Sequence, residues 1–307
     1  MQHQLKLRLM GSDFELIVLD ADAARGRQHL QAAVAEIQRI EALLTEFRDT
    51  SITAQLNAQA GRAPVAVGPE VYALLERCLL LSELSQGAFD ISAGALKPLY
   101  DFRRGAAGFP DPARLRAARQ GVGYQHIELL PGHRAFLRRP GMRIGFGAIG
   151  KGYAADCARA LLESRGVANG VVNASGDLTA WGRPAEGAAW RIGVADPARP
   201  DHVLLWLPLA GASVATSGNY EQFFEHDGIR YSHNLDPRTG LPTRYLQSVT
   251  VVAAKAELAD ALATVVTVTG PEVGLHLIDQ LPDTHCVLID EQHRVVTSRH
   301  LTLPDHA

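Results

Sequence analysis

The chain has 307 residues, of which 47% are hydrophobic and 21% are charged, a mixture typical of globular proteins and not of disordered, fibrous or membrane-spanning ones. Its formal net charge of −3 lacks the basic excess that is typical of nucleic-acid-binding proteins. The three cysteines, Cys78, Cys157 and Cys286, are scattered, so they indicate neither a disulfide framework nor a paired metal site.

The N-terminal part of the chain predicts a hairpin followed by helices. Asp22 is a suitable N-cap for a long helix, in which apolar residues recur every three or four positions, and Gly87 is suited to end a second helix. In chain order, the expected elements are strands at 4–9 and 14–19 around a turn at 10–13, helices at 22–47 and 70–85, a loop at 101–108 and a short helix at 112–120.

The C-terminal part is richer in short strands. The expected elements are strands at 126–130, 135–138 and 142–146, a helix at 151–165, strands at 170–174, 190–194, 203–208 and 213–217, a hairpin at 219–231, a strand at 248–253, helices at 256–268 and 271–280, and two final strands. Strands outnumber helices and form hairpins, which favours an α+β fold with an antiparallel sheet. No flexible linker is evident, so residues 1–307 are expected to form a single catalytic domain, which allows two intimately packed subdomains.

A glycine-rich segment, GFGAIGKGY at 145–153, lies between a predicted strand and a predicted helix. It fits the G-x-G-x-x-G dinucleotide fingerprint, with Asp177 as a late acidic residue. It also fits the G-x-x-x-x-G-K phosphate loop, except that Gly152 stands where a Ser or Thr would bind magnesium. In both patterns, glycines let backbone N–H groups approach an anion at a helix N-terminus. A tight turn from strand to helix explains the segment equally well.

Asp260 and Thr264 lie four residues apart on a predicted helix, so their side chains share one face. A carboxylate and a hydroxyl together could form part of the shell of a hard cation such as Mg²⁺. The alternative is structural: Asp260 complements the helix dipole and Thr264 only packs.

Three further segments carry polar or aromatic groups at predicted turns. His233 precedes the turn sequence DPRTG and could act as a general base near neutral pH, although a loop histidine without a role is the commoner case. The segment TSGNY at 216–220 is typical of a binding loop or of a simple turn. The segment GAFD at 87–90 could bind a flat ring, or it could end a helix before a packed Phe.

Taken in order, these segments resemble one family, the ApbE flavin transferases, which are FAD:protein FMN transferases. The resemblance covers nearly the whole chain, and no single motif carries it. The matching residues are MGS at 10–12, Glu41, Leu44, Phe47, Arg48, Ser51, Leu56 and Asn57, GAFD at 87–90, GAIGKGYA at 147–154, VNASGD at 172–177, Thr216, Ser217, Gly218 and Tyr220, His233, DPRTG at 236–240, and DALAT at 260–264.

The resemblance implies an α+β fold of duplicated antiparallel sheet and helix subdomains, similar to the T-fold, with FAD in the cleft between them. It implies a Mg²⁺-dependent enzyme that moves FMN from FAD to a Thr or Ser hydroxyl of a target flavoprotein and releases AMP. The implied metal ligands are Asp260, Thr264 and the carbonyl of Ala148, and the implied catalytic residue is His233. The implied flavin or nucleotide contacts are Met10, Phe47, Ala88, Phe89, Asp90, Gly145, Lys151 and Ser248.

The sequence departs from the family pattern at three places. Gly145 stands where the family usually has Asp, which puts one FAD contact in doubt, and Ser175 replaces the first glycine of a usual Gly-Gly pair. Many members carry a lipoprotein signal, whereas this N-terminus alternates polar and apolar residues. As written, the sequence predicts a cytoplasmic protein without a membrane span, and a periplasmic one if the sequence is trimmed.

Three alternative functions remain. Water could replace the protein hydroxyl, which would make the protein an FAD pyrophosphatase that yields FMN and AMP. A non-catalytic FAD-binding protein is favoured by the missing acid at Gly145. A nicotinamide oxidoreductase built on residues 145–150 would require a doubly wound parallel sheet, which the hairpin-rich C-terminal half argues against.

Overall fold

The centre of the protein is an eight-stranded sheet in which all paired neighbours are antiparallel. The computed structural model describes residues 1–102, 108–184, 187–209, 211–218 and 223–301. In spatial order, the strands are β1 (Gln2–Leu9), β2 (Ser12–Leu19), β6 (Gly170–Ala174), β7 (Asp177–Trp181), β10 (Ser213–Gly218), β13 (Leu246–Ala253), β14 (His285–Asp290) and β15 (Val295–Thr297). The expected α+β class with an antiparallel sheet is confirmed.

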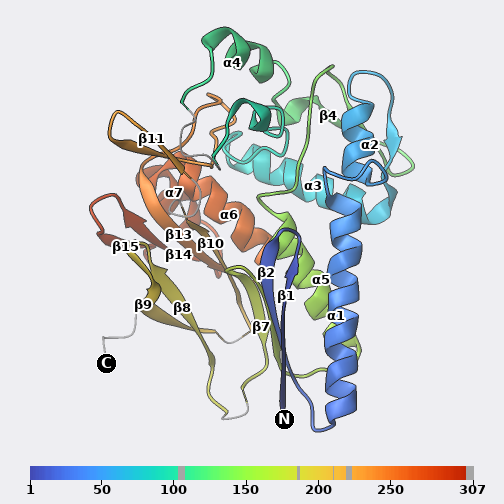
Figure 1. Ribbon diagram of the computed structural model, residues 1–307, viewed down its shortest axis with the longest axis vertical. Coiled ribbons are helices and arrows are strands. Elements are labelled where there is room, and N and C mark those ends of the chain that lie inside the picture. The colour runs from blue at the N-terminus through green and yellow to red at the C-terminus, as the bar shows by residue number, and fades with distance from the viewer. Residues whose placement is uncertain (103–107, 185–186, 210, 219–222, 302–307) are drawn as a thin grey trace.

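The sheet consists of two four-stranded halves that meet between β7 and β10. In the part of the chain that the structure describes, the β7–β10 ladder pairs Ser213 with Thr179 and Val214 with Leu178. Helices α1 (Ala23–Leu44) and α5 (Gly150–Ser164) lie over the first half, and α6 (Ala256–Thr269) and α7 (Pro271–Ile278) lie over the second (Figure 1). This arrangement corresponds to the duplicated sheet and helix units that the family resemblance implies.

The largest hydrophobic core lies between the first half of the sheet and its helices. Phe14, Leu16 and Val18 alternate along β2 and are buried against Ile37 and Ile40 of α1. Full burial of each such side chain contributes about 1.5–3 kcal/mol. Around this core lie α2 (Ile52–Ala58), α3 (Gly68–Leu84), the 3₁₀ turns Lys97–Leu99 and Tyr124–His126, and a small sheet of β3 (Val65–Ala66), β5 (Arg134–Leu137) and β4 (Ile127–Leu130).

A β-hairpin covers the other face of the sheet. It is formed by β8 (Trp190–Asp196) and β9 (Arg199–Leu209), and its Val194 and Leu207 share a core with Val171, Leu178 and other sheet residues. The molecule is therefore layered, with helices, the central sheet and this hairpin in turn.

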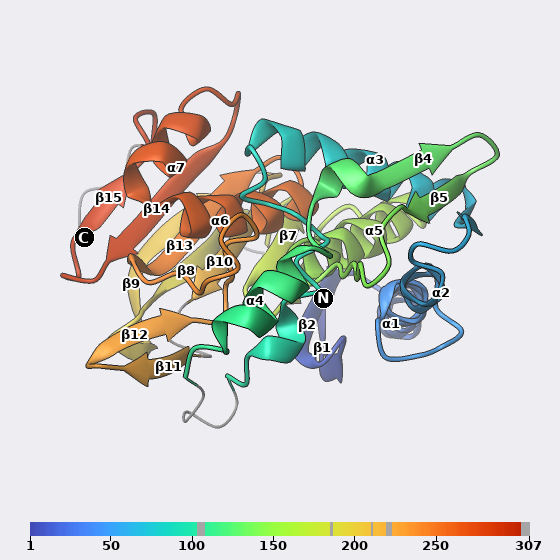
Figure 2. The same cartoon turned by 90° about the horizontal axis from the view of Figure 1, so that it is seen from above.

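A second hairpin, β11 (Phe223–His226) and β12 (Ile229–Ser232), lies near α4 (Pro112–Arg119), as Figure 2 shows from above. Phe109, just before α4, packs edge-on against Phe224 and Tyr231, with ring centroids 5.6 and 4.9 Å apart. This hairpin confirms the one expected at 219–231, except that residues 219–222 lie outside the described residues. Residues 103–107 of the expected loop also lie outside them.

One predicted strand, at residues 142–146, is wrong. The Ile144 N–H donates to Oδ1 of Asn57 at 2.7 Å, and the Asn57 side-chain amide donates to the Ile144 carbonyl at 3.0 Å. The Gly145 N–H donates to the Ile91 carbonyl at 2.9 Å. Because a side chain of α2 and the Ile91 carbonyl satisfy these backbone groups, the segment needs no neighbouring strand beyond a single parallel bridge from Ala93 to Arg143. The sequence pattern did not predict α2, β3 and β7, which are short.

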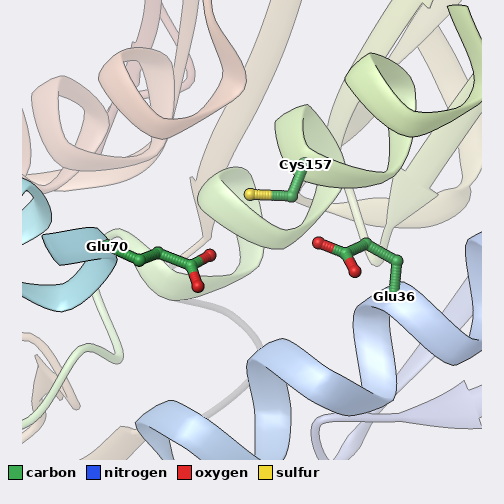
Figure 3. Close-up of side chains that lie close together, drawn as sticks. All are labelled: Glu36, Glu70 and Cys157. Carbon is green, nitrogen blue, oxygen red and sulfur yellow. The ribbon is translucent and has the colours of Figure 1, made fainter. Parts of the chain in front are cut away.

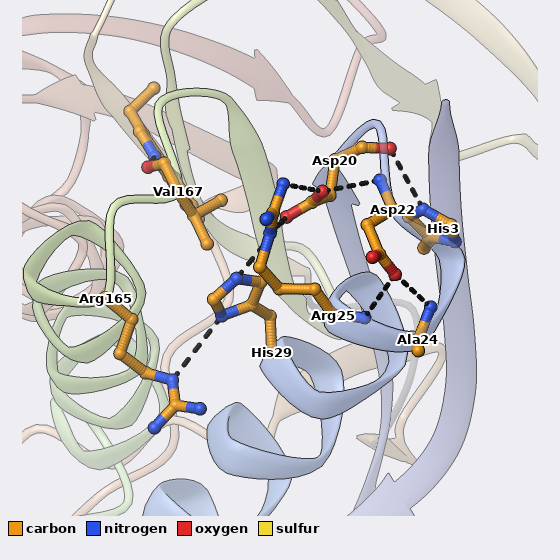
Figure 4. A network of polar contacts seen from close by, with 9 residues as sticks. His3, Asp20, Asp22, Ala24, Arg25, His29, Arg165 and Val167 are labelled. Atoms are coloured by element: carbon orange, nitrogen blue, oxygen red, sulfur yellow. Dashed lines mark hydrogen bonds and ion pairs between the residues drawn. The ribbon is translucent and has the colours of Figure 1, made fainter.

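A polar network links the N-terminal part of α1 to the β1–β2 hairpin and to the segment after α5 (Figure 4). The Asp22 carboxylate caps α1 by accepting the N–H groups of Ala24 and Arg25, as predicted. Arg25 donates twice to Asp20, at 2.7 Å each, and holds the pKa of that carboxyl well below its usual range. Arg165, which follows α5, donates to Nδ1 of His29 at 3.4 Å. The network fixes how α1 and α5 lie together, and α5 carries the candidate site.

Among the described residues, no helix is both long and apolar enough to cross a lipid bilayer.

Candidate active site

The glycine-rich loop opens onto a cavity of about 270 Å³. Segments from all over the chain line this cavity, which we call the inner cavity. Its wall includes Ala88, Phe89 and Asp90, Lys97, Gly145, Gly147, Ala148 and Lys151, Ser175 and Asp177, Thr216, Ser217 and Gly218, His233, and Asp260 and Thr264. The structure thus brings together most of the residues that the sequence singled out.

A second cavity, of about 550 Å³, adjoins the first and is called the outer cavity here. Met10 and Phe47 line it, and Gly147 and Lys151 line both cavities. Met10 and Gly11 form the two-residue turn between β1 and β2, both with positive φ (50° and 74°). The Phe47 side chain is exposed, so its ring is open to a ligand in this cavity.

Charges of opposite sign meet at the floor of the inner cavity. Lys151, in the first turn of α5, forms an ion pair with the buried Asp177 at the start of β7. Asp260 on α6 is also buried, and the pKa of its carboxyl is raised well above the usual value. Burial is the main cause, and the Asp177 carboxylate adds to it, while Lys151 opposes it. Two buried carboxyl groups therefore share one lysine.

A close contact between α5 and α6 positions Asp260. The Gly152 N–H donates to Oδ2 of Asp260 at 3.2 Å. A Cβ at Gly152 would lie only 2.2 Å from the Ala256 carbonyl oxygen, so the two backbones touch at this point. One turn further along α5, Asp156 accepts the N–H groups of Ala256 and Glu257, at 3.0 and 2.9 Å, and so caps α6 from outside that helix. The glycine loop and the Asp260 helix therefore form one joined unit.

The residues at this floor fit a hard divalent cation. Asp260 and Thr264 line the inner cavity one helical turn apart, as predicted, and Ala148 lines it from the loop. Carboxylate, hydroxyl and carbonyl oxygens are the donors that Mg²⁺ prefers. The raised pKa of Asp260 means that Lys151 and the Gly152 N–H compensate its ionised form only in part. A cation placed there would supply the rest.

His233 also lines the inner cavity, from the segment after β12. The Phe102 ring packs edge-on against its imidazole at 6.5 Å between centroids. The DPRTG turn follows at once, and the Asp236 carboxylate holds Arg238 at 2.9 Å. His233 therefore lines the same cavity as the acidic floor.

The segment after α3 forms another wall. A left-handed turn at Gln86 and Gly87 ends the helix, so that Ala88 and Phe89 are buried beside the cavity. Both carboxylate oxygens of Asp90 already accept protein hydrogen bonds, from Ser92 at 2.7 and 2.8 Å and from the Tyr124 N–H at 2.8 Å. Burial raises the pKa of this carboxyl. Asp90 thus braces the wall, whatever contact it makes with a ligand.

One predicted contact residue, Ser248, does not line either cavity. Ser248 is buried on β13, opposite Gly218 of β10, so it stands behind a residue of the cavity wall. Tyr220 lies outside the described residues.

An ion pair that the sequence did not predict lies at the junction of the two cavities. Glu46 lines the outer cavity and Lys97 lines the inner one, and Lys97 Nζ lies 2.5 Å from Oε1 of Glu46. The residues are 51 positions apart, so no local pattern could pair them. The only sequence signal is the scarcity of lysine, since two of the four lysines in the chain line this site.

A third group of potential ligands lies on the far side of α5. Glu36 of α1, Glu70 of α3 and Cys157 of α5 point toward one another (Figure 3). Arg39 lies between the two carboxylates and donates to each twice, at 2.6–2.9 Å. Burial raises the pKa of the Cys157 thiol to about 11, so it stays protonated at neutral pH. The Arg39 guanidinium already pairs with both carboxylates of this cluster, which ties three helices together.

Over most of its length, the chain is similar to one family of known proteins. The sequence model of the ApbE family matches residues 10–288. The chain is 36% identical to an FAD:protein FMN transferase of Treponema pallidum, over 90% of this chain and 81% of the relative. It is 33% identical to another of that name from Klebsiella pneumoniae, over 94% and 90% respectively.

Solved structures agree. The ApbE protein of Thermotoga maritima superposes with a TM-score of 0.89 at 30% identity and covers 97% of each chain. The flavinyl transferase ApbE of Pseudomonas stutzeri, in its apo form, gives a TM-score of 0.86 at 29% identity, over 97% of this chain and 95% of the other. The similarity thus extends over nearly the whole fold.

Proposed function

The chain belongs to the ApbE family, and from that premise we propose that it is an enzyme, an FAD:protein FMN transferase. In the proposed reaction, a Thr or Ser hydroxyl of a target flavoprotein attacks the flavin-side phosphorus of FAD. A new P–O bond forms, the bond from that phosphorus to the bridging oxygen breaks, and AMP leaves. FAD is the flavin donor, and the target flavoprotein is the partner.

One observation carries this proposal. Asp177, Asp260 and Thr264 give the inner cavity an acidic, oxygen-rich lining, and this lining lies beside a glycine loop at a helix N-terminus. Such a loop suits a phosphate group, because its backbone N–H groups and the helix dipole favour an anion. An anion and a group of carboxylates in one cavity require a cation between them. A nicotinamide oxidoreductase is not supported, because the central sheet is antiparallel throughout.

Asp260, Thr264 and the Ala148 carbonyl would hold Mg²⁺, which would neutralise charge on the diphosphate. The protein's own residues bind and orient the reactants. Gly152 and Asp156 hold α6 so that Asp260 faces the loop. Lys151, paired with Asp177, places a positive charge at the junction of the cavities, where the diphosphate would lie.

His233 would accept the proton of the attacking hydroxyl. It faces the inner cavity, and histidine is the side chain that most often serves as a general base in enzymes. A positioned base typically contributes about 10²–10⁴ in rate. We expect His233→Ala to lower the rate of transfer by that range while FAD still binds.

The test is to incubate the protein with FAD, MgCl₂ and a flavoprotein domain that carries a candidate Thr or Ser, and to measure the mass of the target. Attached FMN with an equal amount of AMP supports the proposal. AMP released at the same rate without a target would instead indicate a pyrophosphatase. FAD binding with neither product would leave a flavin-binding protein and overturn the proposed activity.

A further inference from the structure

The ion pair between Glu46 and Lys97 crosses the junction between the two cavities. Glu46 follows α1 and lines the outer cavity, whereas Lys97 begins the 3₁₀ turn Lys97–Leu99 and lines the inner one. Their charged atoms lie 2.5 Å apart. The Glu46 side chain is 13% exposed and the Lys97 side chain is 52% exposed, so the carboxylate is held in the wall while the ammonium group reaches solvent.

The ion pair occupies space that glycine leaves open. A Cβ at Gly145 would lie 2.8 Å from Oε1 of Glu46 and 3.3 Å from Nζ of Lys97. A Cβ at Gly147 would lie 3.7 Å from the same ammonium group. Any larger residue at position 145 would therefore displace the Glu46 carboxylate. Glu46 thus brings a carboxylate from another segment against the backbone at Gly145.

A ligand that fills both cavities must pass this junction. FAD has a flavin at one end, adenine at the other and a diphosphate between them. If its two ends occupy different cavities, the diphosphate lies where the cavities meet, near Gly147 and Lys151. Lys97 reaches the same junction, so two of the chain's four lysines flank it. A lysine ammonium on a flexible stem is well suited to bind phosphate as a point charge.

We propose that Lys97 is a second diphosphate-binding lysine, held by Glu46 until FAD arrives. On binding, the ammonium group turns from the carboxylate to a phosphate oxygen. Glu46 thereby lowers the affinity for FAD, because its carboxylate repels the diphosphate and competes with it for the Lys97 ammonium group. The inference rests on the proposed function only in taking FAD as the ligand. It assigns flavin selectivity to this ion pair. A flavin with a diphosphate gains a contact with the Lys97 ammonium group on binding, whereas riboflavin, which has no phosphate, gains no such contact.

The test measures binding of FAD and riboflavin, by quenching of flavin fluorescence at saturating MgCl₂, to four proteins. These are the unchanged protein, Lys97→Gln, Glu46→Gln and Lys6→Gln. Lys6 is the matched control, because it is exposed and pairs with Glu15 on the β1–β2 ladder. A charge-assisted hydrogen bond to phosphate predicts that Lys97→Gln weakens FAD binding about tenfold. Glu46→Gln should tighten FAD binding by about two- to fivefold.

Riboflavin binding should be the same in all four proteins. The opposite signs of the two substitutions separate this role from a structural one, because a purely structural ion pair would make both variants bind more weakly. Unchanged FAD affinity in Lys97→Gln, or equal losses in Lys97→Gln and Glu46→Gln, would overturn the inference. If the unchanged protein binds no FAD, the proposed function fails as well. If it binds FAD and the variants bind like it, only the role of Lys97 fails.

Discussion

Replacing Gly152 by Ala tests whether the contact between α5 and α6 positions Asp260 in the inner cavity. The new Cβ would lie 2.2 Å from the Ala256 carbonyl oxygen, 2.5 Å from its carbonyl carbon and 2.8 Å from the Glu257 nitrogen. All three are backbone atoms and cannot rotate away, so α5 and α6 must separate by about 1 Å to reach ordinary contact. The Gly152 N–H to Asp260 hydrogen bond, already 3.2 Å long, would then break.

The expected loss of stability is modest. Overpacking costs about 1–3 kcal/mol, and the higher helix propensity of Ala offsets about 1 kcal/mol of that. The expected loss of activity is larger, because a 1 Å displacement at a reacting centre can cost about 10²-fold in rate. We therefore expect Gly152→Ala to remain folded, to need more Mg²⁺ for half-maximal FMN transfer and to lose about 10²-fold in rate.

The assay is FMN transfer as a function of MgCl₂ concentration, with urea unfolding measured in parallel. Gly108→Ala is the control, because its Cβ would meet nothing within 4 Å. If Gly152→Ala transferred FMN as fast as the control at every Mg²⁺ concentration, the contact between α5 and α6 would not position Asp260, and the reasoning would be refuted.

Three further predictions concern single side chains. Asp260→Asn should abolish Mg²⁺-dependent transfer. Without Mg²⁺, this variant should unfold at the same or a higher urea concentration than the unchanged protein, because the substitution removes a buried carboxyl group that lies near Asp177. A large fall in its free energy of unfolding would contradict this. Burial raises the pKa of Asp156 to about 6, from 3.8, so the folded state holds this proton more tightly than the unfolded chain. Its contribution to stability is therefore present below about pH 4 and lost as the pH rises through 6, by at most about 3 kcal/mol. Asp156→Asn should remove that part of the pH dependence in urea unfolding at pH 4 and 7, and equal slopes for both proteins would count against it. Ser175 has a φ of 57° in the β6–β7 turn, so Ser175→Gly should raise the free energy of unfolding by up to about 1 kcal/mol, and a lower midpoint in thermal unfolding would contradict this.

The local sequence predicted most of the fold. The alternation of apolar residues, the Asp22 cap and the position of Gly87 correctly indicated the first hairpin and the helices after it. The strand predicted at 142–146 was wrong, because its backbone partners are Asn57 and Ile91, far away in the sequence. The sequence pattern there is apolar enough for a strand, and only the tertiary contacts decide otherwise.

The candidate site shows the same division. Spacing alone put Asp260 and Thr264 on one helical face, and the motif order indicated the family. That Asp177 and Asp260 share Lys151, that Asp156 caps a helix 100 positions away and that Glu46 meets Lys97 could not be inferred from spacing. A sequence sets which groups are available and what local backbone they favour. Which charges share a cavity depends on how the halves of the sheet and their helices pack, since Coulomb energy and burial depend on distance in space.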